Sequence, residues 1–156
     1  MSLEKAKTHL KKYNLEERII LFDTSSATVA LAAEALGCEE ARIAKSLSFS
    51  LGDSAILVVA AGDARVDNRK FKDRFEAKPR MLAFDEVEMK IGHAVGGVCP
   101  FGINEGVKVY LDESLRRFDI VYPAAGTASS AVKLTLSELE LACETCEWID
   151  VTKLPE

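Results

Sequence analysis

Apolar and polar positions alternate along the chain in two ways, one typical of helices and the other typical of strands. Within residues 2–13, Leu3, Ala6 and Leu10 form one apolar stripe at helical spacing, and Ser2 can cap that helix. The same spacing predicts helices over residues 28–36 (with Ser25 or Ser26 as cap and Gly37 as stop), from the cap Asp67 to residue 75, from the cap Asp85 to Gly92, and over residues 113–118 and 137–146.

Short runs of alternating apolar residues predict the strands. Residues 44–51 and 54–61 flank Gly52-Asp53 and predict a β-hairpin. Further strands are predicted over residues 19–22, 81–84, 107–111, 119–123 and 131–135. Short strands with helices inserted between them indicate an α+β domain. We expect a mixed, strongly curved, barrel-like β-sheet with surrounding helices.

Length and composition indicate a single domain that covers residues 1–156. The chain is 48% hydrophobic and 29% charged, which is ordinary for a globular protein in water. No apolar run approaches the length of a membrane span, and residues 1–12 are charged and helical in pattern, unlike a signal peptide. Four cysteines do not suggest a disulfide scaffold. We therefore expect a cytoplasmic protein with no membrane partner.

The charge distribution restricts the nucleic-acid partners. A net charge of −5 argues against a protein that wraps long nucleic acid, so DNA is not expected. Residues 65–80 nevertheless hold seven basic and three acidic residues, and Arg69, Lys70 and Lys72 are candidates for contacts with the phosphates at one end of an RNA. The alternative is a solvated helix face with mixed charges.

A glycine-rich loop is the most informative segment of the sequence. Residues 92–102 read G-H-A-V-G-G-V-C-P-F-G, in which Gly96 and Gly97 can adopt positive φ and expose peptide N–H groups to a ligand. Pro100 stiffens the loop and favours extended geometry at Cys99. Such a loop suits a phosphate, a carboxylate or an ester oxyanion, and His93 at its border is a candidate for ligand contact. The alternative is a glycine bulge between two strands.

Other common catalytic arrangements are not recognisable in the sequence. There is no G-x-S-x-G, no H-E-x-x-H and no evident carboxylate pair, so we predict neither a serine hydrolase of that type nor a metal or cofactor. His9 is expected at the surface. Cys143 and Cys146 form C-E-T-C, which leaves a zinc site or a redox pair open, but two small half-buried packing residues are favoured.

Lys45 is the candidate catalytic cation. It lies in A-R-I-A-K-S-L-S-F, after small residues and at the start of an alternating strand. A lysine in this position can place a point charge on a phosphate or on a developing oxyanion. The alternative is a lysine that faces solvent from the strand.

Several separated segments together resemble one known family. They are E-A-L-G-C-E-E-A-R-I-A-K-S-L (34–47), G-D-A-R-V-D-N-R-K-F (62–71), G-G-V-C-P-F-G (96–102) and A-A-G-T-A-S-S-A-V-K-L-T-L-S-E-L (124–139). In this order and spacing they resemble the YbaK and prolyl-tRNA synthetase editing-domain family over nearly the whole chain. Lys45 falls on the family's characteristic lysine, and residues 96–100 fit its G-x-x-x-P loop.

The resemblance implies a trans-editing aminoacyl-tRNA deacylase, which hydrolyses the ester of a mischarged tRNA such as tRNA-Pro carrying a small amino acid or Cys. Its partners would be the aminoacylated acceptor end of tRNA and a cognate synthetase. An aminoacyl ester is labile, so positioning, an oxyanion site and a placed water can suffice without an enzyme nucleophile. Lys45 would hold the terminal phosphate or the aminoacyl group, and the amides of residues 97–99 would face the carbonyl. The expected substrate-binding residues are Gly96, Gly97, Val98, Cys99, Pro100, Gly126 and His93.

The segment T-A-S-S-A at residues 127–131 departs from family members that carry a charged or amide residue there, which leaves the edited amino acid open. A catalytically inactive tRNA- or synthetase-binding module of the same fold is the alternative function. Retention of both Lys45 and the glycine loop favours the enzyme.

Overall fold

A computed structural model of the chain describes residues 2–23, 28–144 and 146–155. It has the predicted mixed α+β architecture, in which a six-stranded, strongly curved sheet is surrounded by helices. The α-helices are α1 (Ser2–Lys11), α2 (Val29–Leu36), α3 (Asn68–Phe75), α4 (Phe84–Ile91) and α5 (Leu136–Ala142). The 3-10 helices are η1 (Glu16–Arg18), η2 (Glu40–Arg42) and η3 (Glu113–Arg117). The strands are β1 (Ile19–Leu21), β2 (Ile43–Leu51), β3 (Ser54–Ala61), β4 (Arg65–Val66), β5 (Lys108–Asp112), β6 (Ile120–Pro123), β7 (Ser130–Val132), β8 (Leu134–Thr135), β9 (Glu147–Ile149) and β10 (Thr152–Lys153).

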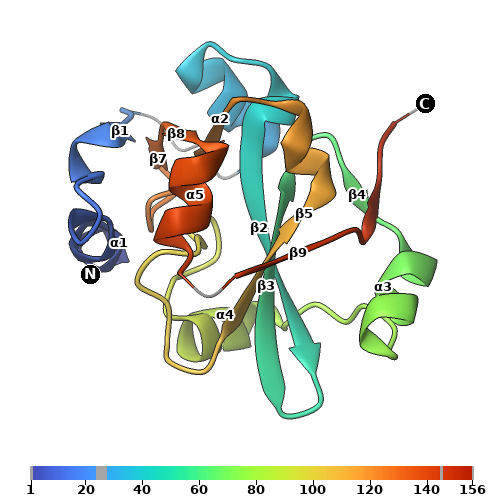
Figure 1. Cartoon of the computed structure of the whole chain (residues 1–156). Coiled ribbons are helices and arrows are strands. Elements are labelled where there is room, and N and C mark those ends of the chain that lie inside the picture. Colours follow the sequence, from blue (N-terminus) through green and yellow to red (C-terminus); the bar gives the residue numbers. More distant parts are fainter. Residues whose placement is uncertain (1, 24–27, 145, 156) are drawn as a thin grey trace.

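The main sheet is mixed, with the strand order β8-β6-β2-β3-β5-β9. The antiparallel hairpin β2–β3 lies at its centre, and parallel pairings join β2 to β6, β3 to β5 and β5 to β9. Two small antiparallel pairs, β1–β7 and β4–β10, lie outside this sheet. Figure 1 shows the long hairpin in the middle of the molecule, with α1 and α5 on one side and α3 on the other.

The hairpin divides the interior into two cores, because alternate residues of a strand point to opposite faces of a sheet. The main core contains Leu57 and Val59 of β3 together with buried residues of α1, α4 and α5. The α3 core contains Ile56 and Val58 of β3 and Phe71 of α3. The sheet therefore has apolar cover on both faces, as a strand of consecutive apolar residues such as β3 requires.

Several helix ends lie at the capping residues that the sequence predicts. Asp67 caps α3 by accepting hydrogen bonds from the N–H groups of Arg69 and Lys70. Gly37 ends α2 in the left-handed conformation with φ 67°. Thr28 caps α2 by accepting from Leu31 N–H, whereas the predicted caps Ser25 and Ser26 lie outside the described residues. None of the described helices has the length and apolar character needed to cross a membrane.

Three local predictions were wrong. Residues 81–84 form a single bridge between Met81 and Phe49 instead of a strand, because α4 already begins at Phe84. Its cap is Ala83, so Asp85 lies inside the helix. The predicted strand over residues 131–135 divides into β7 and β8, which pair with different partners.

Other differences concern the end of α5 and three short strands. Helix α5 ends at Ala142, four residues earlier than predicted, and is opened by a capping box between Thr135 and Glu138. Strands β4, β9 and β10 were not predicted, since runs of two or three residues carry almost no periodicity of their own.

Candidate functional site at the edge of strand β2

A cavity of about 480 Å³ lies along the edge of β2. It is enclosed by α2, α4, the glycine loop and the segment that follows β6; in Figure 1, α2 and α4 lie toward opposite ends of β2. Its wall is formed by Thr28, Val29, Ala32, Ile43, Ala44, Lys45, Ser46, Leu47, Ser48, Met81, Leu82, Phe84, Val87, Val95, Gly96, Val98, Tyr122, Ala124, Ser130 and Ala131. Among these described residues, Lys45 carries the one charged side chain. An apolar wall with few polar groups is typical of a small-molecule site.

The cavity coincides with a gap in the pairing of β2. Ile43 and Ala44 pair with β6, and further along the strand Ser48 O accepts from Leu82 N–H. Between these pairings, no strand of the described part of the chain joins residues 45–47 on this side. Residues from both faces of β2 consequently line the cavity.

Ser46 lies in the middle of this gap. In an antiparallel strand the backbone N–H and C=O groups of every second residue point to the same edge of the strand. The N–H and C=O of Ser46 therefore point to the same edge as the C=O of Ser48, which accepts a hydrogen bond from Leu82 N–H. The Ser46 Oγ is also buried, and no hydrogen-bond partner for it exists among the described residues. Buried polar atoms are normally satisfied, so this unpaired hydroxyl on the cavity wall suggests a ligand.

Two carbonyl groups of the segment that follows β3 hold the ammonium group of Lys45. Its Nζ donates to Ala64 O at 2.5 Å and to Gly62 O at 3.3 Å. An ammonium group has three N–H donors, so one of them has no acceptor among the described residues. Burial lowers the pKa of Lys45, the nearby Asp63 carboxylate opposes this shift, and Arg65 adds to it.

The Asp63 carboxylate is itself fixed by a two-point ion pair. Arg117 contacts both of its oxygens, at 2.6 and 3.1 Å, which holds the pKa of Asp63 below its usual value. Asp63 therefore stays ionised at neutral pH and supports the charged form of Lys45.

The glycine loop reaches the cavity through a tight turn. Gly97 N–H donates to Ala94 O at 3.0 Å, and Gly96 within this turn has φ 96°, a conformation that glycine adopts without strain. Gly97 does not have positive φ, which corrects that expectation. Its N–H is already used within the loop, whereas among the described residues no acceptor pairs with the N–H of Val98. Val98 is thus the better candidate for an amide that faces a ligand.

Gly97 is required by contact with a second loop. A Cβ at this position would lie 2.4 Å from Gly126 O and 2.7 Å from the Cα of Thr127. Gly126 has φ 95°, and its loop is tied together by Ser130, whose Oγ accepts from Ala125 N–H at 3.2 Å and from the Thr127 hydroxyl at 2.9 Å. The position of the glycine loop therefore depends on residues 124–130.

The structure brings only some of the predicted substrate-binding residues to this cavity. Lys45, Gly96 and Val98 line it. Gly97 and Gly126 do not line it but pack against each other where the two loops meet. The side chains of Cys99 and His93 are fully buried in the interior. Pro100 lines a different cavity.

Cys99 and His93 form a buried pair. The His93 Nε2 lies 2.6 Å from Phe101 O and 3.5 Å from the Cys99 sulfur; since a carbonyl only accepts, we assign the proton to Nε2. Burial raises the pKa of the Cys99 thiol to about 12 and lowers the pKa of His93. Both groups are therefore neutral at physiological pH, and a thiolate nucleophile at Cys99 is disfavoured.

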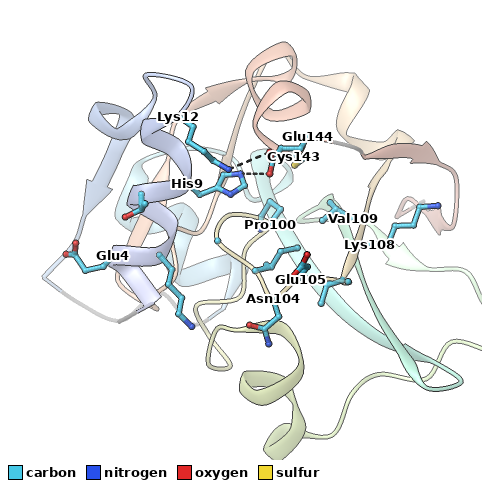
Figure 2. Close-up of a pocket in the computed structure, with 16 residues that line it drawn as sticks. Glu4, His9, Lys12, Pro100, Asn104, Glu105, Lys108, Val109, Cys143 and Glu144 are labelled. Carbon is cyan, nitrogen blue, oxygen red and sulfur yellow. Dashed lines mark ion pairs between the residues drawn. The ribbon is translucent and has the colours of Figure 1, made fainter.

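The second cavity, of about 830 Å³, lies between α1, residues 100–109 and the end of α5 (Figure 2). His9 contacts Ala142 O at 2.6 Å and Glu144 at 3.8 Å, and Lys12 lies 3.6 Å from the same carboxylate. His9 thus joins α1 to the end of α5 and is more buried than predicted. The cations of this cavity already have acceptors, because His9 and Lys12 pair with Glu144, Lys5 donates to Gly92 O, and Lys108 lies 3.9 Å from Glu147. The cavity is therefore a weaker candidate for an anionic ligand.

The three candidate RNA contacts lie on α3 and do not line the β2-edge cavity. Lys70 is committed to structure, because its Nζ pairs with Asp150 at 3.1 Å and donates to Thr152 O at 2.8 Å. Arg69 and Lys72 are exposed. Helix α3 packs through Phe71 on the α3 core, whereas the glycine loop packs on the main core.

Cys143 is buried and Cys146 half-buried, in agreement with two packing residues. Among residues 2–23, 28–144 and 146–155, no three His, Cys, Asp or Glu side chains gather in a geometry that could hold a metal ion.

Sequence reasoning missed several residues of the site. Ser46 and Ser130 were not singled out, nor were Asp63 and its partner Arg117. The one available signal was position, since Ser46 follows Lys45 directly and Ser130 lies within the segment 124–139.

These features place the chain in a known family. The family model for the aminoacyl-tRNA editing domain matches residues 23–141, and the chain belongs to this family, in its YbaK and prolyl-tRNA synthetase branch.

Individual relatives agree with this assignment. An uncharacterized protein of Bacillus subtilis (strain 168), YwhH, is 51% identical over 154 residues, which are 98% of each chain. A proline–tRNA ligase of Halalkalibacterium halodurans is 35% identical over 98 residues, which are 62% of this chain but 17% of the ligase. A crystal structure described as that of a proposed trans-editing enzyme for prolyl tRNA synthetase superposes with a TM-score of 0.87 at 30% identity, and the match covers 97% of both chains.

Proposed function

We propose that this protein is a trans-editing aminoacyl-tRNA deacylase whose substrate is tRNA-Pro that carries a small amino acid or Cys. The observation that carries the proposal is the position of Lys45, the one charged side chain among the described cavity residues, on the same cavity as Gly96 and Val98 of the glycine loop. Membership of the editing-domain family and the likeness to a proposed prolyl editing enzyme support it.

In the proposed reaction the aminoacyl ester enters the cavity with its carbonyl oxygen toward the Val98 N–H. The remaining Lys45 donor bonds the terminal phosphate or the aminoacyl group and holds the ester in place. A water attacks the carbonyl carbon, the bond to the ribose oxygen breaks, and that oxygen receives the proton released by water. The products are the free amino acid and the uncharged tRNA, so no covalent enzyme intermediate forms.

The wall chemistry supports a small substrate side chain. Ala32, Ala44, Ala124 and Ala131 line the cavity, and the unpaired Ser46 hydroxyl offers one polar contact. Such a wall distinguishes similar amino acids only by about 1–3 kcal/mol per methylene group, so several small amino acids are expected to react.

The test is hydrolysis of a panel of tRNA-Pro species charged with Ala, Ser, Cys or Pro. We expect release of the small non-cognate amino acids and sparing of Pro. Binding of these tRNAs without release of any amino acid would reject the enzyme and favour the inactive binding module.

A further inference from the structure

The mouth of the β2-edge cavity is surrounded by exposed apolar side chains. Phe84 is 79% exposed, Met81 57% and Val95 49%, and all three line the cavity. They come from three places in the chain: the start of α4, the bridge beside β2, and the turn of the glycine loop. Contiguous exposed apolar groups around a cavity mark a binding surface more often than chance.

The position of Phe84 follows from the apolar face of α4. Val87 and Ile91, on the same helix face at helical spacing, are 4% and 0% exposed and pack in the main core. Phe84 continues this face by one turn, beyond the end of the core and over the cavity. Met89 of the same helix is 70% exposed but does not line the cavity, so exposure alone does not define the surface.

The charges beside this surface are balanced. Lys78 and Arg80 precede it, Asp85 and Glu86 follow it, and Glu86 forms an ion pair with Lys90 at 3.0 Å. A phosphate backbone would gain little here from charge alone. The available interaction is that of an aromatic ring and two apolar side chains with a flat apolar ligand.

We infer that Met81, Phe84 and Val95 form a stacking platform for the unpaired base of the 3′-terminal nucleotide. The inference rests on the proposed function, in which the ester lies inside the cavity. The base belongs to the same nucleotide as the ester oxygen, so it must lie at the mouth. Stacking on an aromatic side chain is a common way to hold an unpaired base and tolerates different tRNA sequences.

The test measures binding of two uncharged RNA hairpins, one with an unpaired 3′ overhang and one with a blunt end. Phe84→Ala should weaken binding of the overhang hairpin roughly 5- to 100-fold and leave the blunt hairpin unchanged. Phe84→Trp, which keeps a ring, should bind the overhang as well as the unmodified protein. Met89→Ala, from the same helix, is the matched control and should bind both hairpins normally.

Equal binding of both hairpins, or overhang binding that survives Phe84→Ala, would overturn the platform. A change of oligomeric state in Phe84→Ala with unchanged overhang binding would also overturn it, in favour of contact between copies of the chain. Because the RNA is uncharged, the experiment is independent of turnover: a protein that binds the overhang through Phe84 but deacylates nothing contradicts only the proposed catalysis. If the protein is active, Phe84→Ala should slow hydrolysis of aminoacyl-tRNA but not of an amino acid methyl ester.

Discussion

The carbonyl oxygen of Gly126 lies where a side chain of Gly97 would begin, 2.4 Å from the position of a Cβ. A methyl group at residue 97 must push apart two loops, one of which carries Gly96 and Val98 to the cavity. Gly97→Ala should therefore lower the free energy of unfolding by about 1–3 kcal/mol and reduce deacylation. Urea unfolding and turnover of one mischarged tRNA measure the two effects.

A suitable control is Gly52→Asn in the β2–β3 turn. Gly52 has φ 59°, and Asn tolerates this conformation. Apart from its two chain neighbours, no described residue comes within 4 Å of the position that a Cβ would take there. The control should remain active. A Gly97→Ala variant with unchanged stability and activity would show that the loops separate freely.

Replacement of Lys45 tests the proposed cation. Lys45→Met keeps most of the apolar stem and removes the ammonium group, so we expect a loss of about 100- to 1000-fold in kcat for deacylation, the usual effect of removing one fixed donor. Lys7→Met, at an exposed lysine of α1, should be fully active. Wild-type activity in a folded Lys45→Met protein would exclude Lys45 from the reaction.

The sequence predicts some residues of the β2-edge cavity, such as Lys45 and Gly96, but not others, such as Ser46. Lys45 and Gly96 lie in motifs with characteristic residues and spacing, so the sequence alone is enough to assign them to the site through their likeness to a family. The role of Ser46 depends on a gap between two pairings of β2, and both pairings join segments far apart in sequence. The pattern of one strand carries no information about what lies beside its edge.

The same reasoning explains the errors in the fold. The run around Met81 has the apolar character of a strand, but only the neighbouring helix start at Phe84 decides that it makes a single bridge. For Gly97 the sequence correctly indicates that a side chain is not tolerated. It does not distinguish positive φ from close contact with Gly126, because the contact is tertiary.

Cys99→Ala separates a structural from a nucleophilic cysteine. Because burial raises the pKa of this thiol to about 12, it stays protonated at neutral pH, and we expect the variant to deacylate within a few-fold of the unmodified protein. Iodoacetamide should leave Cys99 unlabelled in the folded protein. A folded but inactive Cys99→Ala variant would instead support covalent catalysis.

Charge reversal on α3 tests contact with RNA. Arg69 and Lys72 are the suitable positions, since reversal of Lys70 would also break its bonds to Asp150 and Thr152. If both residues contact phosphates, Arg69→Glu with Lys72→Glu should weaken tRNA binding and lower the salt slope by about 2. Hydrolysis of a short aminoacylated mimic should change much less. Equal losses on both substrates would indicate damage to the fold.

The buried His93 should make stability depend on pH. Burial lowers its pKa from the ordinary value of 6.5, so below that pH the unfolded chain binds a proton that the folded chain does not. Its contribution to stability is present above pH 6.5 and is lost as the pH falls toward the folded pKa, with a slope of up to about 1.4 kcal/mol per pH unit. His93→Gln cannot take up this proton, yet its amide can still donate to Phe101 O. Urea unfolding between about pH 5 and pH 7.5 should therefore show a flatter pH dependence in the variant, and parallel curves would mean that His93 is accessible to protons in the folded protein.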